Sequence, residues 1–274
     1  VQRITRAQLA RYHRRWLDPA RMVLAVVGDV DASQLVTKFT QLFGASGRAR
    51  VTEPEVTPEP PGGRARVVFE QVTKEQAHIV IGFPGTTLRS RDRFALDLIS
   101  SLLSGQGGRL FVGLRDEQGL AYRVSAHSLE GIEPGYFLGY IATGAEKIEA
   151  AIAGVEREFA RLRDKPVGAA ELARVKRYLV GNHEISLQRR GVVAAFVAFN
   201  EAYGLGFKAH LKYGDQIMAV TPADIQRVAR KYLDPRRRIV AIVHPEQLSP
   251  GVAKALGERI EAGVVGTGST HRPK

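Results

Sequence analysis

The feature that most constrains the fold is an internal repeat. Residues 5–28 and residues 221–244 match without gaps, 216 positions apart, and ten of the 24 aligned positions are identical. An ungapped match of this length is poorly explained by coincidence, and an internal repeat indicates a duplicated structural unit. The identical pairs are Thr5/Thr221, Ala7/Ala223, Arg11/Arg227, Arg14/Arg230, Leu17/Leu233, Asp18/Asp234, Pro19/Pro235, Arg21/Arg237, Ala25/Ala241 and Val27/Val243.

Both copies predict the same helix, turn and strand. A threonine opens each copy and can cap an amphipathic helix. The Leu-Asp-Pro that follows ends the helix, because proline disfavours helical backbone in the residue before it. A β-branched segment then predicts a strand, over Met22–Val27 in the first copy and over Ile239–Val243 in the second. We therefore expect the two copies to superimpose as helix followed by strand.

The positions of the two copies predict the domain organisation. The second copy lies near the end of a stretch that starts near Arg66, so the first copy is expected to close a similar domain, most of which lies outside this chain. We expect the remnant of a first domain at 1–43, a Pro/Gly-rich linker at 44–65, a complete second domain at 66–247 and a tail with a frayed end at 248–274. The remnant would expose apolar residues and a strand edge, which favours packing against the second domain or a homo-oligomer.

The order of the elements predicts the fold class. Strands are expected at 67–71, 78–83, 122–129, 136–142 and 238–243, and helices at 90–103, 110–116, 145–163, 168–188, 190–203, 208–218 and 221–232. Strands come first, helices dominate later, and one strand returns to the sheet at the end. This order is typical of an α+β fold, with a mixed or antiparallel sheet and helices layered on one face.

Composition excludes several classes of protein. The chain has no cysteine, so disulfides and thiolate metal sites are excluded. Its apolar stretches are far short of the roughly 20 residues of a membrane helix, so no membrane span is expected. The net charge is +12, carried by 30 Arg and 10 Lys that are spread along the chain. Without a long basic run or interleaved aromatic residues, this charge does not favour a nucleic-acid partner.

Motifs for metal, phosphate and nucleophile chemistry are missing from the sequence. No two of the seven histidines have the H-x-x-x-H spacing of a zinc site, so no metal or cofactor is predicted in this chain. No Gly-x-Ser-x-Gly elbow is present. The cluster Ser104–Leu110 is glycine-rich but lacks the Gly-Lys-Ser/Thr ending of a phosphate loop, and it follows a helix. It predicts a joint between helices that needs positive φ and close backbone approach.

One segment resembles a known family. Residues 107–124 read G-G-R-L-F-x-x-L-R-x-x-x-G-L-A-Y-x-V. Here the chain resembles the insulinase/pitrilysin-type zinc metallopeptidases, which include mitochondrial processing peptidase, and the resemblance extends over essentially the whole chain. Members are built from homologous tandem domains, as the repeat independently suggests. The resemblance implies a first domain with zinc and an H-x-x-E-H motif, and a second domain without zinc.

The resemblance also implies site residues. The second domain of the family contributes an Arg and a Tyr seven residues apart, which hold the substrate backbone and polarise the scissile carbonyl; Arg115 and Tyr122 match this pair. Gly107, Gly108 and Arg109 match the glycine-rich joint before it and are expected to contribute to substrate binding. Both side chains of the pair are hydrogen-bond donors, which suits an oxyanion. A sheet edge can in addition align an extended peptide by strand addition.

The implied function is that of the substrate-binding, zinc-free half of a two-domain zinc metalloendopeptidase acting on peptides or unfolded polypeptides. Its expected partners are the polypeptide substrate and a zinc-bearing catalytic domain, in cis or as a separate subunit. By itself the chain is expected to be inactive. Two alternatives stay open: a non-proteolytic structural or assembly subunit, as in the core proteins of a respiratory complex, and a stand-alone peptide-binding module. The sequence does not indicate the substrate or the compartment.

Overall fold

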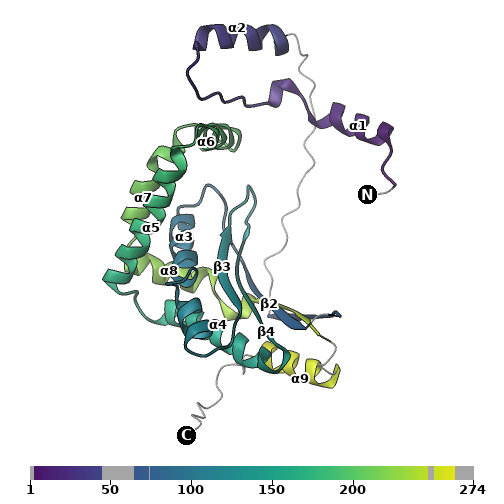
Figure 1. The fold of residues 1–274 in the computed structure, drawn as a ribbon, viewed down its shortest axis with the longest axis vertical. Coiled ribbons are helices and arrows are strands. Elements are labelled where there is room, and N and C mark those ends of the chain that lie inside the picture. Colours follow the sequence, from purple (N-terminus) through teal and green to yellow (C-terminus); the bar gives the residue numbers. More distant parts are fainter. Residues whose placement is uncertain (1–2, 45–64, 74, 246–249, 263–274) are drawn as a thin grey trace. The chain divides into compact units, whose positions relative to one another are not determined.

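The computed structural model describes residues 3–44, 65–73, 75–245 and 250–262 (Figure 1). The chain divides into two compact units, Val1–Pro58 with Asn182–Tyr213 and Glu59–Gly181 with Gly214–Lys274. Most of the predicted linker 44–65 and the end of the predicted tail lie outside the described residues. None of the helices in the described ranges combines the length and the apolar character that crossing a bilayer requires.

The larger unit is organised by a five-stranded mixed sheet with the strand order β1-β5-β2-β4-β3. The strands are β1 (Arg66–Gln71), β2 (Gln76–Pro84), β3 (Arg123–Leu129), β4 (Tyr136–Gly144) and β5 (Ile239–His244). The last strand, β5, lies between the first two: it pairs in parallel with β1 and antiparallel with β2. The pairs β2/β4 and β3/β4 are antiparallel. The α+β class and the returning strand are confirmed.

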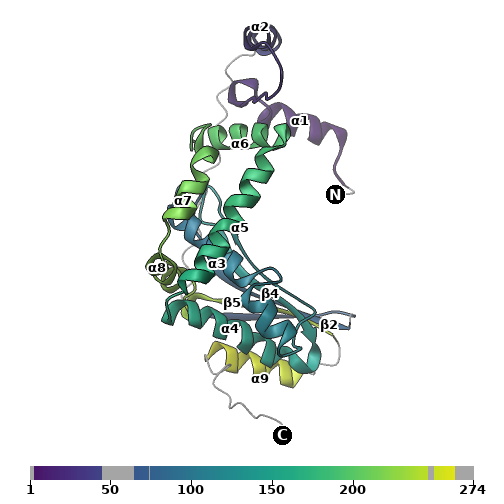
Figure 2. The ribbon, with the colours of Figure 1, turned by 60° about the vertical axis from the view of Figure 1, so that its left-hand side comes forward.

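One face of this sheet carries the core. In β2 every second residue is buried, from Ala77 to Phe83, because side chains along a strand alternate between faces. The helices α3 (Asp92–Leu103) and α4 (Ile148–Asp164) pack on that face, and α8 (Pro222–Tyr232) packs on both of these helices (Figure 2). Residues on the opposite face, such as Val80 and Tyr140, are only half-buried. The predicted layering of helices on one face is therefore confirmed.

The remaining helices follow the predicted ranges closely. They are η2 (Phe111–Asp116), α5 (Ala169–Leu187), α6 (Arg190–Ala202) and α7 (Tyr213–Ala219). The helix predicted at 208–218 is divided into a 3-10 turn, η4 (Ala209–Lys212), and α7.

The predicted frayed end contains a helix. Residues Pro250–Glu261 form α9, and its Leu256 and Ile260 are buried. An added Cβ at Gly257 would contact the Phe69 ring, so α9 lies directly on β1. The buried guanidinium of Arg238 donates to the carbonyl of Ile260 and is 3.0 Å from the Glu156 carboxylate of α4. Packing on β1 and α4 stabilises this helix, which the sequence analysis did not expect.

The internal repeat is visible as repeated local structure. Helix α1 (Arg6–Trp16) and the turn η1 (Pro19–Arg21) are matched, at the same offset of 216, by α8 and the turn η5 (Pro235–Arg237). Both helices begin with a capping box, Thr5 with Gln8 and Thr221 with Asp224. A helix follows each copy, α2 (Ala32–Phe43) after the first and α9 after the second. The repeated helix and turn are confirmed.

The predicted strand at Met22–Val27 is wrong for this structure. Residues 22–27 pair with no strand among the described residues, whereas the matching β5 has a neighbour on each side. A strand is defined by hydrogen bonds to another strand, so a β-branched sequence cannot form one by itself. The repeat thus reproduces the helix and the turn but not the strand.

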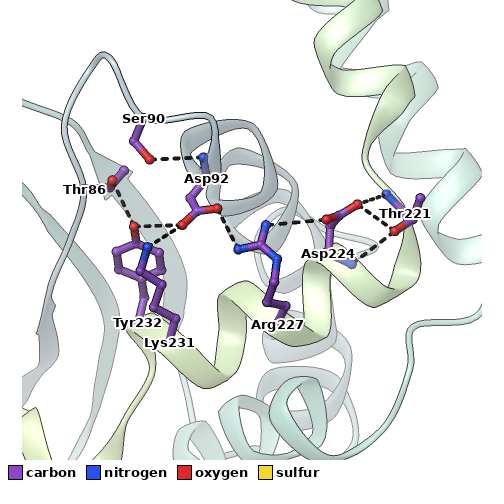
Figure 3. A network of polar contacts seen from close by, with 8 residues as sticks. All are labelled: Thr86, Ser90, Asp92, Thr221, Asp224, Arg227, Lys231 and Tyr232. Atoms are coloured by element: carbon purple, nitrogen blue, oxygen red, sulfur yellow. Dashed lines mark hydrogen bonds and ion pairs between the residues drawn. The ribbon is translucent and has the colours of Figure 1, made fainter.

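A polar network joins α8 to the start of α3 (Figure 3). The Asp92 carboxylate accepts hydrogen bonds from Arg227 at 2.9 Å, from Lys231 at 2.8 Å and from the Tyr232 hydroxyl at 3.1 Å. The side chain of Asp92 is only 12% exposed. Burial by itself would raise the pKa of this carboxyl, but the three donors outweigh burial and hold the pKa below its ordinary value of 3.8. Asp92 therefore stays ionised and ties the two helices together.

Asp92→Asn should lower the free energy of unfolding by about 1–2 kcal/mol at neutral pH, because hydrogen bonds to a charged partner are lost. A folded-state pKa below the unfolded value stabilises the protein above the unfolded pKa, and this stabilisation is lost as pH falls through the folded pKa. The difference between parent and variant should therefore be full at about pH 6 and shrink below about pH 4. Urea unfolding at several pH values measures it. A difference that stayed constant with pH would contradict the assigned charge.

Candidate functional site

The glycine cluster between α3 and η2 is a tight joint. Gly105 has a φ of +81°, a conformation that favours glycine. A Cβ on Gly108 would overlap the carbonyl oxygens of Leu103 and Ser104. Both predicted requirements of this joint, positive φ and close backbone approach, are confirmed.

Two arginines connect this joint to α5. Arg109 donates to the Glu171 carboxylate through Nε at 2.8 Å and Nη2 at 2.6 Å, a bidentate ion pair. The hydrogen bonds from Arg109 lower the pKa of Glu171, so the pair stays charged. Arg174 donates to the Gly107 carbonyl at 3.1 Å. Arg109 therefore has a partner within the protein, and the contact of Gly107, Gly108 and Arg109 with substrate stays a prediction.

The helix after the joint positions Arg115. Residues Phe111–Asp116 form η2 with π-helical hydrogen bonds, a rare geometry that is frequent at functional sites. Leu114 of η2 is buried and contacts α4 closely at Gly154, where no Cβ would fit. Arg115 is exposed, and its Cζ lies 4.7 Å from the centroid of the Phe111 ring. Burial of Leu114 thus sets the orientation of η2, and Phe111 supports the guanidinium.

Tyr122 lies at the entry to β3, beside Arg115. The Thr143 hydroxyl donates to the Leu120 carbonyl at 2.5 Å, and the Tyr122 amide donates to the Ala142 carbonyl at 3.2 Å. These contacts fix the backbone, while the Tyr122 side chain is 74% exposed. The Arg115 Cζ lies 5.8 Å from the centroid of the Tyr122 ring. The structure therefore brings together the two predicted site residues.

No described residue occupies the polar atoms of the Arg115 and Tyr122 side chains, which leaves these atoms available to a ligand. Neither the Arg115 guanidinium nor the Tyr122 hydroxyl forms a hydrogen bond or ion pair with a residue that the structure describes. An exposed guanidinium over an aromatic ring keeps its in-plane N–H groups available. The pair therefore presents two adjacent donors at the surface.

The neighbouring edge of the sheet is closed in its middle. β3 is the last strand of the sheet, and the outer backbone groups of Ala126 are both bound by Ser104. The Ser104 hydroxyl accepts from the Ala126 amide at 2.6 Å and donates to its carbonyl at 2.8 Å. Strand addition along β3 would have to replace this contact. No sequence signal identified Ser104, Glu171 or Arg174 as partners of the site region, because each forms its hydrogen bond with a residue that is distant in the sequence.

The histidines do not form a metal-ligand set in the described part of the chain. Within the residues that the structure describes, no three His, Asp or Glu side chains lie close enough to hold a metal ion. His78 instead shares a hydrogen bond of 2.7 Å with the Tyr140 hydroxyl, and His183 contacts the His210 carbonyl at 2.9 Å. We therefore assign no zinc chemistry to these residues.

Comparison with known proteins identifies the family. Residues 3–179 match the protein family described as "Peptidase M16 inactive domain". The matched range includes the glycine joint, Arg115 and Tyr122. The chain belongs to the peptidase M16 family. The resemblance seen in the motif at 107–124 is thereby confirmed, and the matched part of the family is its inactive domain.

Relatives of the M16 chain are bacterial zinc proteases. An uncharacterized zinc protease of Streptomyces coelicolor is 25% identical over 264 residues, covering 89% of this chain and 54% of the relative. The zinc protease PqqE of Helicobacter pylori is 24% identical over 261 residues, covering 89% of this chain and 56% of the relative. The M16 chain thus spans about half the length of these curated relatives.

Solved structures share the fold of the M16 chain. A protease from Helicobacter pylori superimposes with a TM-score of 0.80 at 20% identity, covering 89% of this chain and 60% of that one. A peptidase M16 inactive domain from Pseudomonas fluorescens superimposes with a TM-score of 0.75 at 21% identity, covering 89% of this chain and 58% of that one. A chain of complex III2 from Candida albicans superimposes with a TM-score of 0.68 at 16% identity, covering 86% of this chain and 57% of that one.

The glycine joint can be tested with a matched pair of substitutions. Gly108→Ala should lower the free energy of unfolding by about 1–3 kcal/mol, because the added methyl overlaps backbone that cannot move freely. Gly107→Ala is the control: its Cβ would meet only the flexible end of Arg174, at 3.4 Å. Chemical unfolding of both variants measures the difference. Equal effects would show that close approach at Gly108 is not what the joint requires.

Proposed function

We propose that this M16 chain carries the end of a first peptidase domain, at 1–43, and a complete second domain, at 66–247, of a two-domain zinc metalloendopeptidase. In this proposal the second domain binds peptide or unfolded polypeptide substrates and the zinc-bearing domain cleaves them. The observation that carries the proposal is the exposed Arg115–Tyr122 pair, with donors that no described residue uses. Zinc would belong to the catalytic domain, in cis or in a partner subunit.

The pair would act on the carbonyl of the scissile peptide. Peptide hydrolysis develops negative charge on the carbonyl oxygen, and donors held near that oxygen stabilise the transition state. The Tyr122 hydroxyl would donate one hydrogen bond, and the Arg115 guanidinium would donate another and add a positive charge. The fixed backbone at Leu120 and Tyr122 supports this role, because a preorganised donor loses little freedom on binding.

The proposal predicts the kinetics of two variants in the complete enzyme, assembled with its zinc-bearing half. Tyr122→Phe and Arg115→Ala should each lower kcat about 10²-fold, roughly 3 kcal/mol, and raise KM less. The reason is that both donors pair best with an oxyanion that exists only in the transition state. Steady-state kinetics with a peptide substrate measures both constants.

Two surface residues of α5 serve as matched controls. Tyr178→Phe and Arg177→Ala remove the same chemical groups from exposed positions and should leave kcat/KM within about twofold of the parent. Tyr122→Phe should keep the parent stability, because an exposed hydroxyl is lost and the ring stays. If Tyr122→Phe unfolds the domain, or has the kinetics of the controls, Tyr122 is structural and the site assignment is wrong.

The proposal also predicts that this chain alone binds no stoichiometric zinc and cleaves no peptide. No H-x-x-E-H motif occurs in the sequence, and the described residues form no metal-ligand set. Metal analysis and a peptidase assay of the purified chain test this. One tightly bound zinc per chain, with activity that a chelator removes, would overturn it.

A second candidate function is a non-proteolytic structural subunit. The fold shared with a chain of complex III2 from Candida albicans supports it, at the level of fold alone. A stand-alone peptide-binding module is the third. An H-x-x-E-H motif in an adjoining coding segment would favour the peptidase over both, and turnover by the assembled halves would decide it.

A further inference from the structure

Three polar side chains meet on the face of the sheet opposite α3 and α4. Arg123 of β3 and His78 of β2 lie on either side of Ala142 of β4, as the strand register shows. Tyr140 lies two residues before Ala142 and on the same face, since side chains along a strand alternate between faces. The Arg123 Cζ lies 6.0 Å from the centroid of the Tyr140 ring, and the Tyr140 hydroxyl shares a hydrogen bond of 2.7 Å with Nδ1 of His78. We call these three residues the Arg123 cluster.

The hydrogen bond between His78 and Tyr140 leaves one donor unused. A neutral imidazole carries one N–H and a phenol carries one O–H, and a single hydrogen bond uses only one of these two hydrogens. If Tyr140 donates to Nδ1, the imidazole keeps its N–H at Nε2; if Nδ1 donates, the Tyr140 hydroxyl keeps its hydrogen. In both tautomers the pair can therefore donate one further hydrogen bond, and no described residue accepts it.

The guanidinium of Arg123 has no acidic partner in the described part of the chain. Its side chain is exposed and forms no ion pair or hydrogen bond with a residue that the structure describes. The strands β2, β3 and β4 contain no Asp or Glu. Glu146, which follows β4, lies with its carboxylate against Gly144 and does not pair with Arg123. Because the Tyr140 ring occupies one face of the guanidinium, the in-plane N–H groups stay available to an anion.

The Arg123 cluster adjoins the donor pair of the proposed function. Arg123 directly follows Tyr122, whose amide donates to the carbonyl of Ala142, and Ala142 is also the residue opposite Arg123. An extended peptide advances about 3.3 Å per residue. A peptide with one carbonyl at Tyr122 therefore has side chains only a few residues away that can reach Arg123.

We infer that the Arg123 cluster is a subsite for a carboxylate of the substrate, and that it favours peptides with an acidic group a few residues from the scissile bond. Arg123 would bind the carboxylate through its N–H groups, and the pair of His78 and Tyr140 would donate the further hydrogen bond. An Asp or Glu side chain and the C-terminus of a peptide both present this group. The inference rests on the proposed function for the ligand being a peptide. It adds a preference for substrate sequence, which donors to a backbone carbonyl do not supply.

The test measures peptide affinity in the absence of turnover. The complete protein is used, with its zinc-bearing half, after a chelator has removed zinc so that bound peptide is not cleaved. The probes are short fluorescent alanine–serine peptides with an amidated C-terminus and a single Glu, Gln or Lys, placed in turn at each position, and fluorescence anisotropy gives Kd. At the best position the Glu peptide should bind about fivefold more tightly than the Gln peptide, because an exposed guanidinium gains a charged partner. High salt should weaken this preference.

Three variants locate the preference. Arg123→Gln should remove it, so that the Glu and Gln peptides bind within about twofold of each other. Arg177→Gln changes an exposed arginine of α5 and is the matched control, which should keep the preference of the parent. Arg123→Glu should reverse the preference toward the Lys peptide, because like charges repel and opposite charges attract. A merely structural role of Arg123 would not produce this reversal.

The hydrogen count of the pair gives a separate expectation. Since either partner by itself can still donate, Tyr140→Phe or His78→Phe should each change the preference little. The double variant removes every donor of the pair and should lower the preference about twofold. Circular dichroism checks that these variants fold as the parent does.

Peptides without Glu but with a free C-terminal carboxylate distinguish the two sources of the anion. A gain in affinity over the amidated form that Arg123→Gln removes assigns the cluster to chain ends, whereas a gain seen only with Glu assigns it to side chains. The inference is overturned if neither group raises the affinity, or if Arg123→Gln leaves the gain unchanged. Equal losses in Arg123→Gln and Arg177→Gln would also overturn it, because the general positive charge of the chain would then explain the preference. These are binding results, so they differ from an unchanged kcat in Tyr122→Phe, which would contradict the proposed function.

Discussion

The insertion of β5 between β1 and β2 is the interaction on which the rest of the larger unit depends. β1 joins the sheet only through β5, with Val68 opposite Ala241. Because α3, α4 and α8 lie between β2 and β5 in the sequence, closing this pairing brings α8 onto α3 and α4. Arg238, directly before β5, then reaches α4 and α9 together. One long-range strand pairing thus determines how α8 packs on α3 and α4 and how Arg238 contacts α4 and α9.

The same packing positions the site region, which comprises the glycine joint, Arg115 and Tyr122. The glycine joint follows α3, which is buried on the sheet, and Arg109 and Arg174 connect the joint to α5. From the joint, η2 carries Arg115 toward the entry of β3, where Thr143 of β4 holds the backbone before Tyr122. Two exposed side chains are therefore positioned by buried neighbours. The held backbone supports the proposed role of the pair as hydrogen-bond donors, because a donor on a fixed backbone loses less conformational freedom on binding.

The two copies of the repeat show the same local sequence in two surroundings. In both copies the capped helix and the Leu-Asp-Pro turn form, since their hydrogen bonds join residues only a few positions apart. Around α8, the carboxylate of Asp92 and the faces of α3 and α4 complete the packing. Around α1, the same apolar and cationic positions are exposed. The contrast separates what a segment forms by itself from what it forms against a partner.

The sequence by itself determined the α+β class, the repeated helix and turn, nearly all helices and strands of the larger unit, the glycine joint and the family. These follow from local sequence patterns, namely the periodicity of apolar residues, helix-capping residues, turn residues and the motif within 107–124. Only the tertiary structure decided that Met22–Val27 is no strand here, that α9 forms where a frayed tail was expected, and that Arg109 binds Glu171. It also decided that Arg115 and Tyr122 lie side by side. The physical reason is that strand pairing, docking of a terminal helix and side-chain ion pairs each require partners distant in the sequence, which no local pattern specifies.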